Sequence, residues 1–138
     1  QYRMQACELG IGDRCTFTGR IDYQREAPGL LAIGDVAVSP KLSRTEGAGK
    51  ILNYMACGLP TVAYDSPVSR EFLGPLGVYA RWGDVEALAA EIVALLDAPA
   101  RREELGSALR ERAQQCFSWE RAAREIVAIY ASLGARPA

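Results

Sequence analysis

Two short apolar runs flank a polar loop and an amphipathic segment between residues 35 and 65 of this chain. The runs Val36–Ser39 and Thr61–Tyr64 have the length of strands, and the apolar spacing within Lys50–Cys57 predicts a helix between them. The loop Pro40–Gly49 then follows the carboxyl end of the first strand. Because a strand, a crossover helix and a parallel strand form one βαβ unit, this loop is predicted to lie where open α/β sheets bind their ligands.

Further strands and short helices flank this unit on both sides. Alternating, β-branched residues predict strands at Cys15–Thr18 and Gly77–Ala80. Helices are predicted at 2–9, at Pro28–Ile33, and from Ser66 or Ser69 to Gly74. Strands that alternate with helices and are joined by short glycine turns predict an α/β fold with a parallel sheet.

Three helices are predicted at the carboxyl end of the chain. Asp84 and Ser118 are typical N-cap residues, and Pro99 suits the first turn of the helix between them. The first of these helices carries one apolar face, made of Val85, Leu88, Ile92, Leu95 and Leu96. The last carries an apolar stripe at helical spacing, made of Ala122, Ile126, Ile129 and Leu133. Such stripes face a core far more often than a ligand, so both are predicted to pack.

The composition is that of an ordinary globular protein, with 49% apolar and 24% charged residues among 138. A formal net charge of −1 provides no basic field that would attract nucleic acid. The chain has no histidine and its four cysteines form no C-x-x-C pair, which predicts no bound metal. Without histidine, proton transfer would fall to a carboxylate or to another domain. No stretch reaches membrane-spanning length and no signal peptide is visible, so the cysteines are predicted to be reduced core residues of a cytoplasmic protein.

Four segments, in order, resemble the carboxyl-terminal domain of glycosyltransferase family 4, also called group 1. They read CTFTGRIDY, DVAVSP, EGAGKILNYMACGLPTVAYD and GDVEALAAEIVALLDAP. Members of that family are retaining enzymes with two Rossmann-like domains around a cleft, the GT-B fold, and this domain holds the nucleotide-sugar donor. The resemblance covers residues 2–132 and implies that residues 1–138 form a single, amino-truncated domain. Its fold would be a Rossmann-like parallel sheet with flanking helices that lacks its first two strands.

The resemblance also places the donor along this chain. The backbone after Gly19, at Arg20 and Ile21, would face the nucleotide base. Glu46 would lie near the hydroxyls of the donor sugar, which makes it the candidate catalytic residue. Sugar or phosphate groups would meet a loop and first helical turn made of Gly47, Gly49, Lys50 and Ile51. Small residues let a backbone approach an anion, and the first N–H groups of a helix lack internal partners. Lys50 either adds a point charge on a phosphate or is a solvated side chain.

Asn53 departs from the family pattern. Family members usually carry Glu, seven residues and a second Glu, which binds the nucleotide ribose. Aligned on Met-Ala-Cys-Gly-Leu-Pro, that second position is Asn53, and Glu46 stands one residue closer than the pattern asks. A neutral hydrogen bond contributes about 0.5–1.5 kcal/mol, against roughly 1.5–3 kcal/mol for a charged one. We therefore expect a donor affinity weakened about tenfold, or a different donor. The alternative is that Asn53 merely faces solvent.

A second departure is that the two strands that open the family domain, and the basic loop that grips the diphosphate, do not precede Gln1 in this chain. In the strand order 3-2-1-4-5-6, the two absent strands stand between Cys15–Thr18 and Val36–Ser39. Unpaired strand edges invite pairing with another chain. The chain is therefore expected either to form a strand-swapped homo-oligomer or to pair these two strands directly.

These observations predict the donor-binding half of a retaining hexosyltransferase that is inactive without its amino-terminal domain. Its partners would be a nucleotide-sugar of undetermined nucleotide and the missing domain. No cofactor is expected, and peripheral membrane association of the parent enzyme stays open. Glu71 is given no catalytic role, and Asp65 and Ser66 either line the cleft or cap the next helix. The alternatives are a non-catalytic scaffold domain, which Asn53 favours, a nucleotide-sugar epimerase, which the missing histidine disfavours, and an unrelated flavodoxin-like domain.

Overall fold

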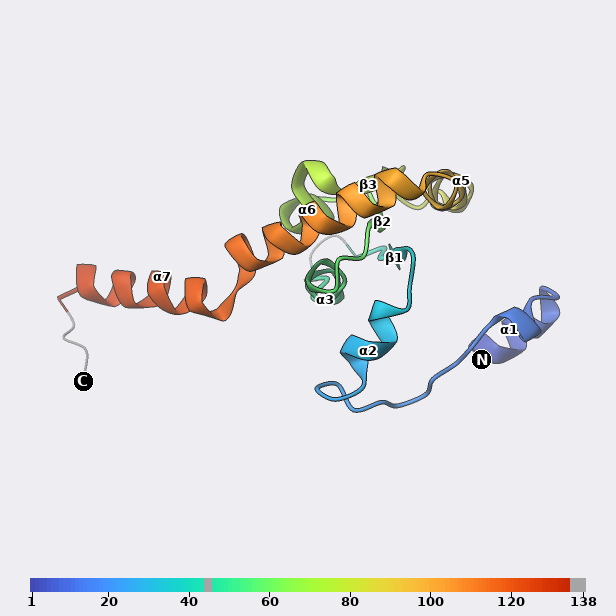
Figure 1. The fold of residues 1–138 in the computed structure, drawn as a ribbon, viewed down its shortest axis with the longest axis horizontal. Coiled ribbons are helices and arrows are strands. Elements are labelled where there is room, and N and C mark those ends of the chain that lie inside the picture. The colour runs from blue at the N-terminus through green and yellow to red at the C-terminus, as the bar shows by residue number, and fades with distance from the viewer. Residues whose placement is uncertain (44–45, 135–138) are drawn as a thin grey trace.

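The computed structural model describes residues 1–43 and 46–134. Its elements, in chain order, are α1 (Tyr2–Glu8), the 3-10 turn η1 (Gly12–Arg14), α2 (Ala27–Ala32), β1 (Ala37–Ser39), α3 (Lys50–Ala56), β2 (Thr61–Tyr64), α4 (Pro67–Leu73), the 3-10 turn η2 (Gly74–Leu76), β3 (Val78–Ala80), α5 (Val85–Leu96), α6 (Pro99–Phe117) and α7 (Trp119–Ser132). Figure 1 shows this order from blue to red. The alternation of strands and helices confirms the predicted α/β class.

Within the described ranges the sheet has three parallel strands in the order β1-β2-β3. Ala37 lies opposite Thr61, and Val62 lies opposite Val78. Helix α3 connects β1 to β2, and α4 connects β2 to β3, as parallel strands require. The predicted central βαβ unit is therefore confirmed. Its loop lies at the carboxyl end of β1.

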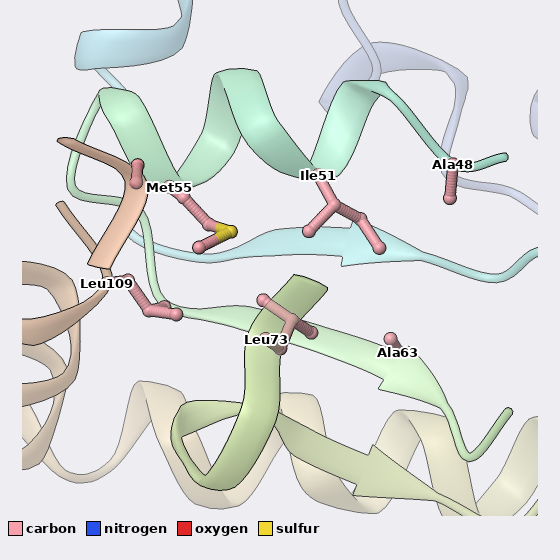
Figure 2. Packing of buried hydrophobic residues seen from close by; sticks show 7 residues of the cluster. Ala48, Ile51, Met55, Ala63, Leu73 and Leu109 are labelled. Atoms are coloured by element: carbon pink, nitrogen blue, oxygen red, sulfur yellow. The ribbon is translucent and has the colours of Figure 1, made fainter. Parts of the chain in front are cut away.

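The two faces of the sheet carry separate cores, because successive strand residues point to opposite faces. On one face, Ala63 of β2 packs with residues of α3, α4 and α6, and Figure 2 shows this cluster at close range. Ile51 and Met55 of α3 are fully buried there, one helical turn apart. On the other face, Val62 packs with Leu88 and with other residues of α5 and β3. Helix α3 is thus fixed to the sheet along one side, and it also packs against α6 and α4.

The predicted strand Cys15–Thr18 is wrong. The segment joins no ladder, and in Figure 1 it runs with α1 and η1 away from the sheet. A strand requires backbone pairing, and this segment pairs with no described strand; it contacts α1 instead, where Nη2 of Arg3 donates to the carbonyl oxygen of Phe17 at 3.1 Å. Direct pairing of this segment with β1 is therefore wrong as well, whereas exchange of strands between copies stays a prediction.

Helix α7 begins after its predicted N-cap Ser118, whose Oγ accepts from the Arg121 N–H at 3.3 Å. The prediction that its apolar stripe packs against the rest of the chain is wrong, because Ile126, Ile129 and Leu133 are 53%, 59% and 76% exposed. In Figure 1 the helix projects beyond the rest of the chain. Periodicity identifies an apolar face without supplying the surface that covers it.

Two further burial predictions hold only in part. In α5, Leu88 and Leu95 are buried, but Val85 and Leu96 are exposed. The cysteines are free thiols; Cys7 is exposed and the other three are half-buried, so none belongs to the core. No helix within residues 1–43 and 46–134 is long and apolar enough to cross a bilayer.

Candidate functional site

The loop between β1 and α3 is held together by a lysine. The Nζ atom of Lys41 donates to the carbonyl oxygen of Gly47 at 2.8 Å and lies 3.2 Å from Oε2 of Glu46. The N–H of Glu46 donates to Oγ of Ser43 at 3.3 Å. The side chain of Glu46 is 75% exposed, so its carboxylate faces solvent while it is paired. The structure thus brings two predicted site residues, Glu46 and Gly47, together on one cation.

The backbone in front of α3 is open to solvent at its two glycines. A Cβ atom added to Gly47 or Gly49 would meet no heavy atom within 4 Å, and neither residue has a positive φ. Internal packing and backbone strain therefore give no reason for glycine at either position. Both residues are exposed, as is Lys50 beside them. Because glycine has no side chain, an external group can approach this backbone closely.

Ile51 belongs to the core. Its side chain is fully buried in the cluster of Figure 2, and its N–H donates to the carbonyl oxygen of Ala48 at 2.8 Å. Ile51 was predicted to meet a sugar or phosphate group, but its side chain and its N–H are both engaged within the protein. What remains for Ile51 is to fix the position of the first turn of α3.

A compact turn shapes the segment that precedes α2. Oδ1 of Asp22 accepts from the N–H groups of Gln24 and Arg25 at 2.9 and 3.0 Å, while the N–H of Asp22 donates to Oε2 of Glu26 at 2.6 Å. Gly19 enters this region with φ at 68°, in the left-handed range that favours glycine. The turn fixes the direction of the residue at its corner, Tyr23.

Tyr23 joins this turn to α3. Its Oη donates to Oδ1 of Asn53 at 2.7 Å, across 30 positions of the chain. The bond brings the segment of Arg20 and Ile21, predicted to face a nucleotide base, to the residue predicted to bind the ribose. Asn53 is half-buried and paired, which contradicts the alternative that it merely faces solvent. The sequence reasoning missed Tyr23, because a single tyrosine in a charged turn has no periodic signal.

Two hollows meet at the Tyr23–Asn53 pair. The larger has a volume of about 620 Å³ and extends over α3 to the junction of α6 and α7. Its walls are formed by Tyr23, Gly49, Leu52, Asn53, Ala56, Arg110, Ala113, Gln114, Phe117, Ser118, Trp119 and Ala122. The smaller, of about 400 Å³, lies between α2 and α3. Polar groups, a cation and aromatic rings thus surround a space large enough for a small ligand.

The residues after β2 serve the fold. Both carboxylate oxygens of Asp65 accept from Arg70, from Nε at 2.5 Å and from Nη2 at 2.8 Å. The hydrogen bond from Arg70 lowers the pKa of Asp65 from its ordinary value. Ser66 and Ser69 form a reciprocal capping box at the start of α4. Of the two roles left open for Ser66, the structure shows helix capping.

The site has the means for binding and positioning a polar, anionic ligand. Its groups are the amide of Asn53 and the backbone of Gly49, which line the larger hollow, and the loop residues Lys41, Glu46, Gly47 and Lys50, which line neither hollow. In the part of the chain that the structure describes, no three His, Cys, Asp or Glu side chains lie close enough to hold a metal ion. Glu46 is the carboxylate of the loop Pro40–Gly49, and its side chain is exposed.

Comparison with known proteins places this chain in context. The family described as "Glycosyl transferases group 1" matches residues 1–98. The chain is 39% identical over 136 residues to an MMP alpha-(1->4)-mannosyltransferase from Mycolicibacterium hassiacum, covering 95% of this chain and 32% of that protein. It is 32% identical over 117 residues to a GDP-mannose-dependent monoacylated alpha-(1-6)-phosphatidylinositol monomannoside mannosyltransferase from Corynebacterium glutamicum, covering 80% and 30%.

Solved structures share the fold. Sucrose-phosphate synthase from Thermosynechococcus elongatus superposes with a TM-score of 0.85 at 31% identity, covering 96% of this chain and 33% of that one. HepE from Anabaena, solved in complex with UDP, superposes with a TM-score of 0.84 at 23% identity, covering 95% and 36%, and shows the fold alone. These likenesses confirm the predicted Rossmann-like architecture. The chain spans about a third of the length of the relatives it matches.

Proposed function

This chain belongs to the group 1 glycosyl transferases, and from that premise we propose that it is part of the donor-binding half of a retaining enzyme. The whole enzyme would transfer a hexose from a nucleotide-sugar to an acceptor. The observation that carries the proposal is the hydrogen bond from Tyr23 to Asn53, because it joins the two segments expected to bind base and ribose. Residues 1–138 would form one domain of a protein about three times as long, as the coverage of the relatives suggests.

The proposed roles follow the order of groups in the donor. The backbone at Arg20 and Ile21 meets the base, and Asn53 meets the ribose from the opposite wall. The exposed backbone at Gly47 and Gly49, with the ammonium of Lys50, meets the diphosphate or the sugar.

Glu46 completes the series at the sugar end. Its exposed carboxylate accepts from sugar hydroxyls. The work of these groups is positioning, together with electrostatic stabilisation of the departing diphosphate.

We propose a mannosyl donor, with GDP-mannose as the first nucleotide-sugar to test. Both curated relatives described above are named mannosyltransferases, and the one from Corynebacterium glutamicum is named GDP-mannose-dependent. In a protein as long as these relatives, of which this chain spans about a third, the acceptor site and the amino-terminal domain would belong to the remainder. The isolated chain is therefore expected to bind donor weakly and to transfer no sugar. A cytoplasmic location, peripheral membrane association of the parent and exchange of strands between copies stay predictions.

The experiment is a calorimetric titration of the full-length protein with GDP-mannose, UDP-glucose and ADP-glucose, followed by a product assay with the donor that binds. Binding of one donor at micromolar to millimolar concentration is expected for a working transferase. Asn53 in place of the usual Glu favours a second candidate, a non-catalytic scaffold domain. Absence of binding with all three donors would contradict the transferase proposal and support the scaffold.

A further inference from the structure

Lys41 makes two contacts that close the loop between β1 and α3. Its ammonium donates to the carbonyl oxygen of Gly47 and pairs with the carboxylate of Glu46, at 2.8 and 3.2 Å. The side chain of Lys41 is only 27% exposed, whereas that of Glu46 is 75% exposed. The lysine thus lies beneath the loop and the glutamate lies on its outer surface. Neither the family resemblance nor the relatives' names assign a role to Lys41.

The contact with Gly47 fixes the orientation of a peptide group. In a trans peptide, the carbonyl oxygen and the following N–H point in opposite directions. Because the oxygen of Gly47 points at Lys41, the N–H of Ala48 in the same peptide points away from it. Lys41 therefore determines the side of the loop on which this N–H is presented.

The contact with Glu46 fixes a carboxylate that still faces solvent. Lys41 approaches Oε2, while the side chain as a whole remains exposed. A hydroxyl of a ligand can thus donate to this carboxylate without breaking the ion pair. An ion pair whose carboxylate is exposed contributes little to folding stability. The consequence of this contact is expected in ligand binding.

We propose that Lys41 is a positioning residue for the sugar part of the donor. It holds the carboxylate of Glu46 and the peptide between Gly47 and Ala48 in the geometry that meets the hydroxyls of a hexose next to the diphosphate. Lys41 itself contacts protein groups and acts through them. This inference rests on the proposed function.

The test is a double-mutant cycle in the full-length protein, with Lys41→Met, Glu46→Gln and both changes together. Calorimetry measures affinity for GDP-mannose and for GDP. Lys41→Met is expected to weaken GDP-mannose binding about tenfold and GDP binding by less than about threefold. If Lys41 acts through Glu46, the two changes are non-additive, and adding Lys41→Met to Glu46→Gln costs much less than it does alone.

Two further variants make the result specific. Lys41→Arg keeps the charge and hydrogen-bond donors, and should restore most of the affinity for GDP-mannose. Arg121→Met removes another surface ion pair, to Glu125 at 2.7 Å on α7, and should change neither affinity. The thermal unfolding midpoint of Lys41→Met should fall by about 5 °C at most, because the variant loses one charged hydrogen bond and one ion pair whose carboxylate is exposed.

The outcomes separate this inference from the function on which it rests. A wild type that binds GDP-mannose, with Lys41→Met within about twofold of it, overturns the role of Lys41 alone. Equal losses for GDP-mannose and GDP, or full additivity with Glu46→Gln, also overturn it. A wild type that binds none of GDP-mannose, UDP-glucose and ADP-glucose overturns the proposed function, and this inference with it.

Discussion

Replacing Gly106 by alanine should destabilise the protein, although alanine is the better helix former. Gly106 is buried within α6, where that helix crosses the chain just after α3. A Cβ atom at this position would overlap the carbonyl oxygen of Gly58, lie 3.2 Å from its carbonyl carbon and lie 3.6 Å from Cδ of Pro60. The obstacle is backbone, so no side chain can rotate away and the two segments must separate.

The magnitude follows from two opposing effects. The change from glycine to alanine within a helix contributes about 1 kcal/mol of stability. Overpacking a tight core typically costs about 1–3 kcal/mol, and a clash with backbone lies at or above the upper end. The expected net loss in the free energy of unfolding is about 2 kcal/mol. For a domain of this size, that corresponds to a fall in Tm of about 5–10 °C.

Urea unfolding followed by circular dichroism measures this loss, with Gly29→Ala as the matched control. Gly29 also lies within a helix, α2, but a Cβ atom there meets no heavy atom within 4 Å. The control should be neutral or up to about 1 kcal/mol more stable than the wild type. A Gly106→Ala variant as stable as the control would refute the close contact between α6 and the chain that follows α3.

Three further changes test the cap of α5 and the site. Asp84→Asn should make the free energy of unfolding less dependent on pH in acid, because the Ala87 N–H, and then the Arg81 guanidinium, lower the pKa of Asp84 below its ordinary 3.8. Because the folded pKa is the lower one, the stabilisation is present above the ordinary value of 3.8 and is lost as the pH falls through the folded value, so the urea midpoints of wild type and variant should converge as the pH falls below about 4; a difference that stays constant with pH would contradict the cause. Tyr23→Phe should weaken donor binding about three- to tenfold in calorimetry while leaving unfolding unchanged, because Tyr23 is 66% exposed and loses one neutral hydrogen bond; equal affinity would count against a role for the pair. Asn53→Glu should tighten donor binding about tenfold in the same assay, because a carboxylate adds charge to the bond with a ribose hydroxyl; unchanged affinity would remove Asn53 from the ribose site.

Local signals were sufficient for most elements of the fold. The residues Thr61–Tyr64 form β2 with the predicted bounds, because a β-branched and apolar run between a Gly-Leu-Pro turn and a polar segment has one local solution. Asp84 caps α5 through the Ala87 N–H, as the side-chain chemistry of an N-cap predicts. In both cases residues close along the chain determine the local structure.

The predictions that failed concern features that depend on residues far along the chain, or on a surface that the described residues do not supply. Cys15–Thr18 has the residue pattern of a strand but no described strand pairs with it, and the stripe on α7 has an apolar face but no described surface against it. The pairing of Tyr23 with Asn53 depends on how α2 and α3 meet, which no local pattern encodes. The burial of Ile51, by contrast, follows from its position one helical turn from Met55 on the apolar face of α3.

Hydrogen–deuterium exchange of the full-length protein, with and without GDP-mannose, tests the location of the donor site most directly. Amide exchange reports where a ligand stabilises the backbone. Donor binding should slow exchange together in residues 19–23 and 46–53, the two segments that the Tyr23–Asn53 bond joins. Slower exchange elsewhere, with both of these segments unchanged, would contradict the account.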